Sequence, residues 1–174
     1  MAITIKGTGI VTSNDFKNVV WTGRTKNGKA VTITLNNAIN KSNIDLSMVE
    51  KDDTVATLAF EGAYNNNDYM AATTGDFAEP WQITYAGTTS DAANGTILLG
   101  AGVVSIAGTD VALTRGGSQF TVEREYREIN ADGDRGTVKE RVVIDAARAT
   151  LTLNALTWIT HMTDIYPAIS TASS

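Results

Sequence analysis

The sequence predicts an all-β fold: a β-sandwich or partial barrel with one short flanking α-helix and a long protruding β-hairpin. The first observation is that apolar and polar residues alternate along most of the chain, as in strands with one buried face. The second is that these alternating runs are rich in Val, Ile and Thr, which suit a pleated surface. The third is that the chain has 15 Gly and only 2 Pro, with turn-forming residues between the runs.

The expected strands follow the alternating runs along the chain. Lys26-Asn27-Gly28-Lys29 is a strong hairpin signal, because Asn-Gly favours the tight turn that joins two antiparallel strands. Ala107-Gly108-Thr109-Asp110 is a weaker signal of the same kind. The last residues, "STASS" (170–174), are small and polar, and we expect them to fray. The runs cover residues 2–11, 29–38, 53–62, 80–86, 102–108, 118–126, 136–144 and 148–156.

One segment departs from the period of two and predicts a short amphipathic helix near residues 159–166, lying on the sheet. Pro167 should end this helix at about Tyr166, because proline removes a backbone donor and restricts the preceding residue. The apolar residues at helical spacing are Ile159, Met162, Ile165 and Ile169.

The length of 174 residues suits a single domain with a sizeable core. The segment "AGTTSDAANGT" (86–96) is small and polar, as linkers are, and it joins a block of residues 1–86 to a block of residues 95–174. The strands of neither block are expected to close a sandwich alone. We therefore expect one domain over residues 1–174, in which both blocks share a core.

Composition excludes several classes of function. The net charge is −5, so binding of DNA through a basic surface, without regard to base sequence, is not expected. The chain has no cysteine, which removes disulfides and thiolate metal sites. No apolar run approaches the roughly 20 residues that span a bilayer, so no membrane partner is expected.

The segment "NADGDRG" (130–136) superficially resembles a calcium-binding loop. Asn130, Asp132 and Asp134 match the first three ligand positions of such a loop. However, Arg135 occupies the position that needs Gly, and Arg141 occupies that of the bidentate acid. Strand-like runs flank the segment, and its Asp, Gly and Asn residues favour turns. The segment therefore reads as a hairpin tip, and we expect no metal and no other cofactor.

Catalytic residues are also not expected. His161 is the single histidine, and Asp164 lies three residues away on the short expected helix, where such a pair is usually structural. Nucleophilic catalysis needs a base beside the nucleophile, and the sequence offers no convincing one. The chain is not expected to be an enzyme.

The charged hairpin is the most informative feature. Residues 115–148 hold seven acids and seven bases, and in "TVEREYREI" (121–129) charges alternate onto both faces. Because neither face is apolar, the outer half should project toward solvent or a partner rather than pack on its own core. With the turn centred on Gly133, Glu125 would lie opposite Arg141. Further from the tip, the apolar set Phe120, Val142 and Ile144 should root the arm in the core.

This arm is our predicted self-association element. Its charged residues are Glu123, Arg124, Glu125, Arg127, Glu128, Asp132, Asp134, Arg135, Lys139, Glu140 and Arg141.

A second candidate surface is the aromatic segment "YNNNDYMAATTGDFAEPW" (64–81). Binding modules often gather aromatic residues in loops, so this segment supports an alternative function. In that reading the chain is a β-sandwich binding module, a tail-decoration or adhesin domain that recognises a host surface. The contact residues would be Tyr64, Tyr69, Phe77 and Trp81.

The chain resembles the tail tube (major tail) proteins of long-tailed bacteriophages. The first half of such proteins is matched by "GAGVVSIAGTDVALTRGGSQFTVEREYREINADGDRGTVKERVVIDAARATLTLNAL" (100–156), through its "AGTDVALTRGG" turn and its charged long hairpin. The second half is matched by "WTGRTKNGKAVTITLNNAINKSNIDLSMVEKDDTVATLAFEGAYNNND" (21–68) with "PWQITY" (80–85). Together these segments cover nearly the whole chain.

The resemblance implies a β-sandwich with one flanking helix and a long hairpin. It implies that six copies form a ring whose inner strands join into a continuous barrel, and that the rings stack into a tube that conducts DNA. The partners would then be further copies of the chain and other tail proteins, with DNA only as passing cargo. An acidic chain suits this role, because a basic lumen would hold the phosphates. The resemblance places the protein in the phage virion, after synthesis in the bacterial host cytoplasm.

The order of the two blocks departs from the family, in which the block with the charged hairpin comes first. Here it comes second, as in a circular permutation in which residues 86–96 bridge the former ends. Domains with neighbouring surface termini tolerate such a change. New chain ends between the helix and a strand can nevertheless block the stacking of rings.

Overall fold

The computed structural model describes residues 3–44, 55–64, 79–86, 97–116, 118–129, 142–156 and 159–173. Short 3₁₀ turns, Ser13–Asp15 and Ile159–His161, and one helix, α2 (Met162–Ile165), accompany the strands. The strands are β1 (Ile3–Gly7), β2 (Lys17–Thr25), β3 (Ala30–Asn40), β4 (Ala56–Glu61), β5 (Trp81–Tyr85), β6 (Ile97–Ile106), β7 (Thr109–Thr114), β8 (Gln119–Glu128), β9 (Val142–Leu156) and β10 (Ile169–Ser173).

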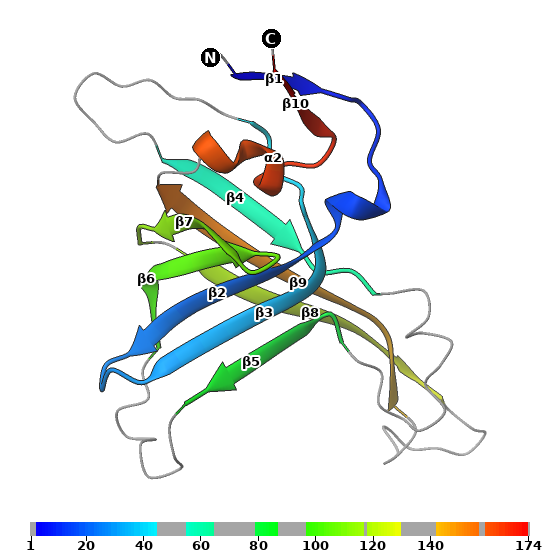
Figure 1. Cartoon of the computed structure of the whole chain (residues 1–174). Coiled ribbons are helices and arrows are strands. Elements are labelled where there is room, and N and C mark those ends of the chain that lie inside the picture. Colours follow the sequence, from blue (N-terminus) through cyan, green and yellow to red (C-terminus); the bar gives the residue numbers. More distant parts are fainter. Residues whose placement is uncertain are drawn as a thin grey trace.

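The main sheet closes into a barrel. Its strands run in the order β2-β6-β7-β9-β4-β3, and pairing of β3 with β2 completes the ring, with every described pair antiparallel (Figure 1). Two further strands extend it, β5 beside β3 and β8 beside β9. The all-β prediction with one short helix is confirmed. Each strand of the ring has a neighbour on both sides, although β3 with β4 and β7 with β9 meet through only two residue pairs each. Of the two extensions, each has a neighbour on one side among the described residues.

Each sequence block supplies one half of this barrel. The first block supplies β2, β3 and β4, and the second supplies β6, β7 and β9. The blocks meet where β2 pairs with β6 and where β4 pairs with β9. The side chains of both blocks therefore enclose one interior. Of the predicted linker 86–96, only Ala86 belongs to the described residues.

Both predicted hairpin turns are present. Gly28 adopts a φ of 80° between β2 and β3, and the backbone N–H of Thr25 donates to the carbonyl of Lys29 at 2.9 Å. Ala107 and Gly108, with φ of 50° and 84°, form the two-residue turn from β6 to β7. Positive φ matches the twist of antiparallel strands and costs glycine no strain, which is why Gly recurs in these turns.

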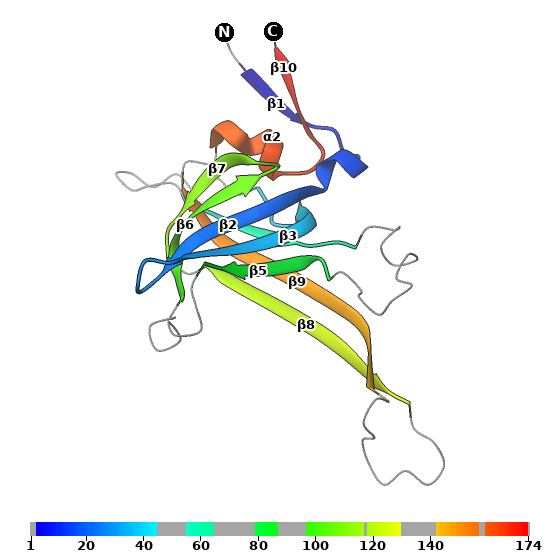
Figure 2. The ribbon, with the colours of Figure 1, turned by 60° about the horizontal axis from the view of Figure 1, so that its bottom comes forward.

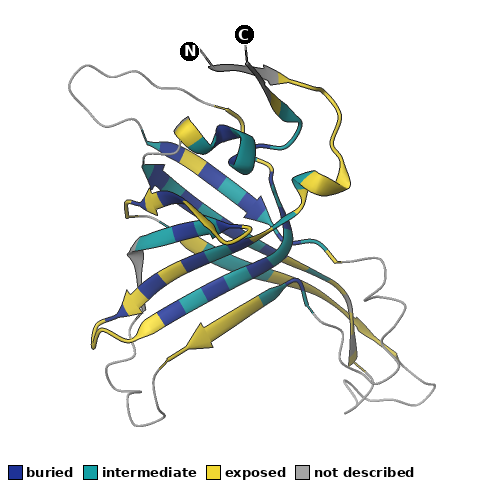
Figure 3. Ribbon diagram, viewed as in Figure 1, coloured by how far each residue is buried: buried dark blue, intermediate teal, exposed yellow. Residues whose placement is uncertain are grey.

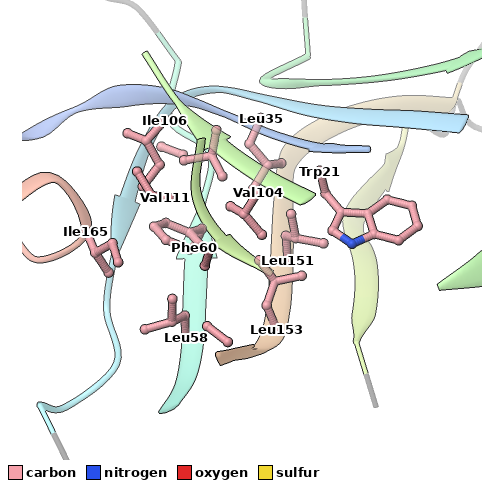
Figure 4. Close-up of a cluster of buried hydrophobic side chains, with 14 of the residues drawn as sticks. Trp21, Leu35, Leu58, Phe60, Val104, Ile106, Val111, Leu151, Leu153 and Ile165 are labelled. Atoms are coloured by element: carbon pink, nitrogen blue, oxygen red, sulfur yellow. The ribbon is translucent and has the colours of Figure 1, made fainter. Parts of the chain in front are cut away.

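The core follows the alternation of the strands (Figure 3). From Val19 along β2 every second residue is buried, and β4 and the barrel half of β9 repeat the pattern. In β3 the alternation shifts by one residue between Leu35 and Ala38. Figure 4 shows the side chains turned toward one another, with Ile165 joining them from the helical segment. The largest fully buried side chains are Trp21, Phe60, Leu35, Leu58, Leu151 and Leu153.

Two glycines make room for Trp21, which is 0% exposed. A Cβ atom on Gly23 would lie 2.0 Å from Cη2 of the indole, and one on Gly102 would lie 2.5 Å from Nε1. The indole Nε1 donates a hydrogen bond to Oγ1 of Thr114 at 3.4 Å. The strand β2 was not among the predicted alternating runs, because Gly23 and Thr25 interrupt its apolar face.

The helical segment was predicted at the right place. It begins with the 3₁₀ turn at residue 159 and ends at Tyr166, directly before Pro167. The side chains of Met162, Ile165 and Tyr166 are buried with the core cluster. The segment covers one end of the barrel, however, where we expected it to lie on the sheet (Figures 1 and 2). Ile169 does not continue the helix but begins β10.

The expectation that the C-terminal residues fray is wrong for residues 170–173. They belong to β10, which pairs with β1 in a separate two-stranded sheet, with Ile3 opposite Ser173. A short segment ties this sheet to the barrel, because the Asp15 carboxylate accepts hydrogen bonds from the backbone N–H of Ala168 at 3.0 Å and of Thr12 at 2.6 Å. These bonds hold the pKa of Asp15 below its usual value. The two ends of the chain are therefore neighbours.

Candidate interaction surface

The predicted long hairpin is formed by β8 and β9. The last part of β9, residues 150–156, lies in the barrel beside β4 and β7. Residues 142–148 form strand pairs, among the described residues, with β8 alone. Figure 2 shows this part leaving the barrel as an arm, at the end opposite to β1 and β10. The arm thus presents backbone edges outside the closed barrel.

The predicted register of the arm is wrong. Glu125 lies opposite Ala146, not opposite Arg141, and the last described pair is Glu128 with Val142. A register shift between Glu125 and Tyr126 gives β9 one extra residue. A charged hairpin has no apolar face of its own from which to predict the pairing, so the anchored end decides it. There Phe120 lies opposite Leu151, a core residue.

This register also moves Val142 and Ile144. We expected them near the root of the arm, but they lie in its outer half, opposite Glu128 and Tyr126. Val142, Ile144 and Tyr126 are 42%, 48% and 62% exposed. One face of the outer arm is therefore more apolar than the sequence of β8 alone indicates. The sequence of β9 shows the apolar residues Val142 and Ile144, but their position in the arm follows only from the register of β9 with β8.

The predicted self-association residues divide into two groups. Glu123, Arg124, Glu125, Arg127 and Glu128 all lie exposed on β8, as the prediction required. The hairpin tip, "NADGDRG", lies outside the described residues, and so do the remaining predicted charges of the arm: Asp132, Asp134, Arg135, Lys139, Glu140 and Arg141.

A groove separates the arm from β5. It encloses about 460 Å³ between Trp81 and Ile83 on β5 and Phe120, Val122, Arg124 and Tyr126 on β8. The rings of Trp81 and Phe120 are tilted with their centroids 5.7 Å apart. Trp81 lies opposite Leu35 in the register, and Phe120 lies opposite Leu151. The groove is thus an opened continuation of the barrel core.

Arg124 closes one side of this groove with an ion pair. Its Nη2 lies 2.8 Å from Oε2 of Glu79, and its guanidinium carbon lies 5.8 Å from the centroid of the Trp81 ring. The indole N–H of Trp81 donates to the same carboxylate. The hydrogen bond to Glu79 raises the pKa of Arg124. Because Glu79 compensates Arg124, the described groove is apolar with one neutralised ion pair.

Of the predicted aromatic contact residues, two lie within the described part of the chain. Trp81 lines the groove, and Tyr64 lies near the same ion pair. Partial burial and the negative charge of Glu79 together raise the pKa of Tyr64. Tyr69 and Phe77 lie outside the described residues. Sequence reasoning missed Phe120 and Val122 as partners of Trp81, because β5 and β8 are neighbours only in the folded chain.

His161 belongs to a surface ion cluster at the other end of the barrel. Its Nδ1 lies 3.7 Å from Oδ2 of Asp164, whose Oδ1 lies 3.2 Å from Nζ of Lys17. These contacts join the helical segment to the start of β2. Among the described residues, no three His, Asp or Glu side chains are grouped so that they can hold a metal ion.

Comparison with protein-family models, with curated proteins and with solved structures gives no match. Within the described part of the chain, no helix is both long and apolar enough to span a bilayer.

Proposed function

We propose that the chain is a structural protein of a bacteriophage virion, which self-assembles into stacked hexameric rings of a tail tube. The observation that carries this proposal is the arm of β8 and β9. It extends beyond the barrel, and Glu123–Glu128 are exposed along it. Its register also places Tyr126 opposite Ile144, an exposed apolar pair. An exposed two-stranded ribbon is marginally stable by itself, so a partner surface would stabilise it.

The open edges supply a mode of assembly. In the described part of the chain, β5 pairs on one side only, with β3, and β8 pairs on one side only, with β9. Strands from a neighbouring copy can add backbone hydrogen bonds at such edges. Edges that differ within one copy generate a heterologous contact, which produces a closed ring when its rotation closes. This is the arrangement that the resemblance to tail tube proteins implies.

The charges of the arm suit a self-complementary contact. Acids and bases are balanced over residues 115–148, so copies in register can pair opposite charges without accumulating one sign. Each exposed ion pair contributes only about 0–1 kcal/mol, so we expect no single charge to be decisive. The net charge of −5 supports passage of DNA, because counterion release favours binding only on basic surfaces.

The position of the chain ends bears on the proposed permutation. β1 and β10 lie side by side at the end of the barrel opposite to the arm (Figure 2). In a permuted tail tube protein they would have been continuous. Stacking of rings therefore depends on whether this two-stranded sheet leaves the facing surface free.

The test is to remove the arm at a register pair. Replacing residues 126–145 by Asn-Gly joins Glu125 to Ala146, which lie opposite each other, while keeping Arg124 and its ion pair. We expect this chain to be folded by circular dichroism and to form no rings or tubes by light scattering, whereas the intact chain forms them in electron micrographs. The matched control changes Lys26 and Lys29 to Ala in the other hairpin turn, and it should still assemble. Assembly of the arm-deleted chain would contradict the proposal, as would an intact chain that stays monomeric at high concentration.

A second candidate function is recognition of a host surface by a binding module. The observation in its favour is the groove of about 460 Å³, whose aromatic and apolar lining is typical of ligand sites. If this function is correct, labelled protein should bind host cells, and Tyr126→Ala should weaken that binding. Leu113→Ala, at a residue that is also exposed but does not line the groove, should leave it unchanged. Equal binding by both variants would exclude the groove.

A further inference from the structure

In the described part of the chain, the strand β5 is an edge strand without the usual protection. Its sequence, "WQITY", contains no charge and no proline, and its ladder with β3 is free of register shifts. Gln82, Ile83, Thr84 and Tyr85 are exposed. Natural sheets usually protect such edges with Lys, proline, bulges or a covering segment. β8 follows that rule with its alternating Glu and Arg residues. The unprotected edge of β5 indicates that another strand covers it.

The backbone groups that face this open edge can be identified. The N–H of Asn36 donates to the carbonyl of Pro80, and the N–H of Ala86 donates to the carbonyl of Ala30, both at 3.0 Å. Even-numbered residues of this segment therefore bond to β3. In an antiparallel ladder, alternate residues point their N–H and C=O to opposite sides. It follows that Trp81, Ile83 and Tyr85 direct theirs at the open edge.

The side chains of β5 read nearly the same in both directions. An aromatic residue stands at each end, polar Gln82 and Thr84 come next, and Ile83 is the centre. An antiparallel strand of the same sequence, centred on Ile83, would place isoleucine opposite isoleucine. It would also place Trp81 opposite Tyr85 and Gln82 opposite Thr84. Aromatic pairs and polar pairs of this kind stabilise neighbouring strands.

We propose that two copies of the chain pair through β5, antiparallel about a twofold axis at Ile83. The pairs centred on residues 81, 83 and 85 would exchange backbone hydrogen bonds, since those residues face the edge. Neither strand carries a charge, so no like charges meet. Ile83 and Tyr85, which are 44% and 38% exposed, would be covered on the groove face. The other exposed strand, β8, is a poorer partner because its Glu and Arg residues would meet no opposite charges on a neutral edge.

This contact and the proposed ring contact would use the same open edge of β5, so they exclude each other there. A twofold contact is isologous, whereas rings stacked in one direction use heterologous contacts. The pairing therefore belongs to the free chain, in which it covers an edge that would otherwise pair non-specifically. A strand of five residues covers far less than the roughly 800 Å² per partner of a standard interface, so the dimer should be weak.

Cysteine cross-linking detects weak contacts and suits a chain without cysteine. In the proposed register Ile83→Cys should form a disulfide with its own copy, across a Cα separation of about 5.5 Å. Gln82→Cys mixed with Thr84→Cys should form the mixed dimer, across about 4.5 Å. We expect both at about tenfold or more above Thr109→Cys, an exposed control residue on β7. That ratio corresponds to a preference of about 1.4 kcal/mol.

The single variants at positions 82 and 84 decide the register. Each alone should cross-link no faster than the Thr109→Cys control, because the twofold axis separates identical residues there. Cross-linking of Gln82→Cys with itself would indicate parallel pairing or an antiparallel register centred on Gln82, and either would overturn the proposal. Absence of the disulfide in Ile83→Cys, in a variant that circular dichroism shows to be folded, would overturn it as well. In the chain without any introduced cysteine, Ile83→Lys should abolish the dimer in sedimentation equilibrium, because it sets two positive charges opposite each other.

Discussion

Replacement of Gly23 by alanine tests whether the glycines beside Trp21 are required by packing. The added Cβ would lie 2.0, 2.5 and 2.7 Å from Cη2, Cζ2 and Cζ3 of the indole. Carbon atoms in contact are normally about 3.5–4.0 Å apart, so the ring would have to move by about 1.5 Å or more. It has no free space for that movement, because it is fully buried and its other edge lies against Gly102.

The expected cost follows from these contacts. Overpacking a core costs about 1–3 kcal/mol, and complete removal of a buried Trp side chain costs about 3–5 kcal/mol. Because the Trp21 ring has no free space beside it, its displacement should lower the free energy of unfolding by about 3 kcal/mol. In a strand position with free space for the Cβ atom, Gly→Ala would be mildly favourable, since glycine weakens strands.

The assay is a double-mutant cycle measured by urea unfolding with far-ultraviolet circular dichroism. In the Trp21→Ala background the clash is absent, so Gly23→Ala should cost close to nothing or stabilise the chain. Gly116→Ala is the control, because no atom lies within 4 Å of its added Cβ. An equal loss of stability from Gly23→Ala in both backgrounds would refute the packing argument and indicate backbone strain.

Three further predictions concern the supports of the fold. Asp15→Asn should lower the urea midpoint of unfolding at neutral pH. Because the pKa of Asp15 is depressed in the folded chain, the stability difference between the two chains should be present above about pH 3.8. It should disappear as the pH falls through the pKa of Asp15 in the folded chain. Thr114→Val should lower the free energy of unfolding by about 1–3 kcal/mol, because it leaves the indole N–H of Trp21 without its hydroxyl acceptor. Thr114→Ser keeps a hydroxyl at this position and should retain most of the stability. Arg124→Ala should leave global unfolding nearly unchanged but speed amide exchange in β8, since it removes the contact with Glu79; unchanged exchange would mean that the ion pair does not hold the arm.

Local patterns determined most secondary structure. The alternating runs predicted the strands along β3, β4, β5, β8 and the barrel half of β9, because a half-buried strand imposes period two on its own residues. Asn27-Gly28 and Ala107-Gly108 predicted turns, because positive φ is a requirement of the turn itself. Met162, Ile165 and Pro167 predicted the helical segment and its end. Each of these signals lies within a few residues of the structure it determines.

The tertiary structure decided everything that depends on which strands meet. Pairing of β3 with β2 closed the barrel, and pairing of β10 with β1 ordered a segment that its composition predicted to fray. The arm had no apolar pattern to select its pairing, so the buried contact of Phe120 with Leu151 set the register and carried Ile144 outward. The groove exists because β5 and β8 extend from different barrel strands and become neighbours only once it has closed. The sequence shows which residues of a strand are buried, but the strand that packs against them is selected by the pairing of segments far apart in the chain.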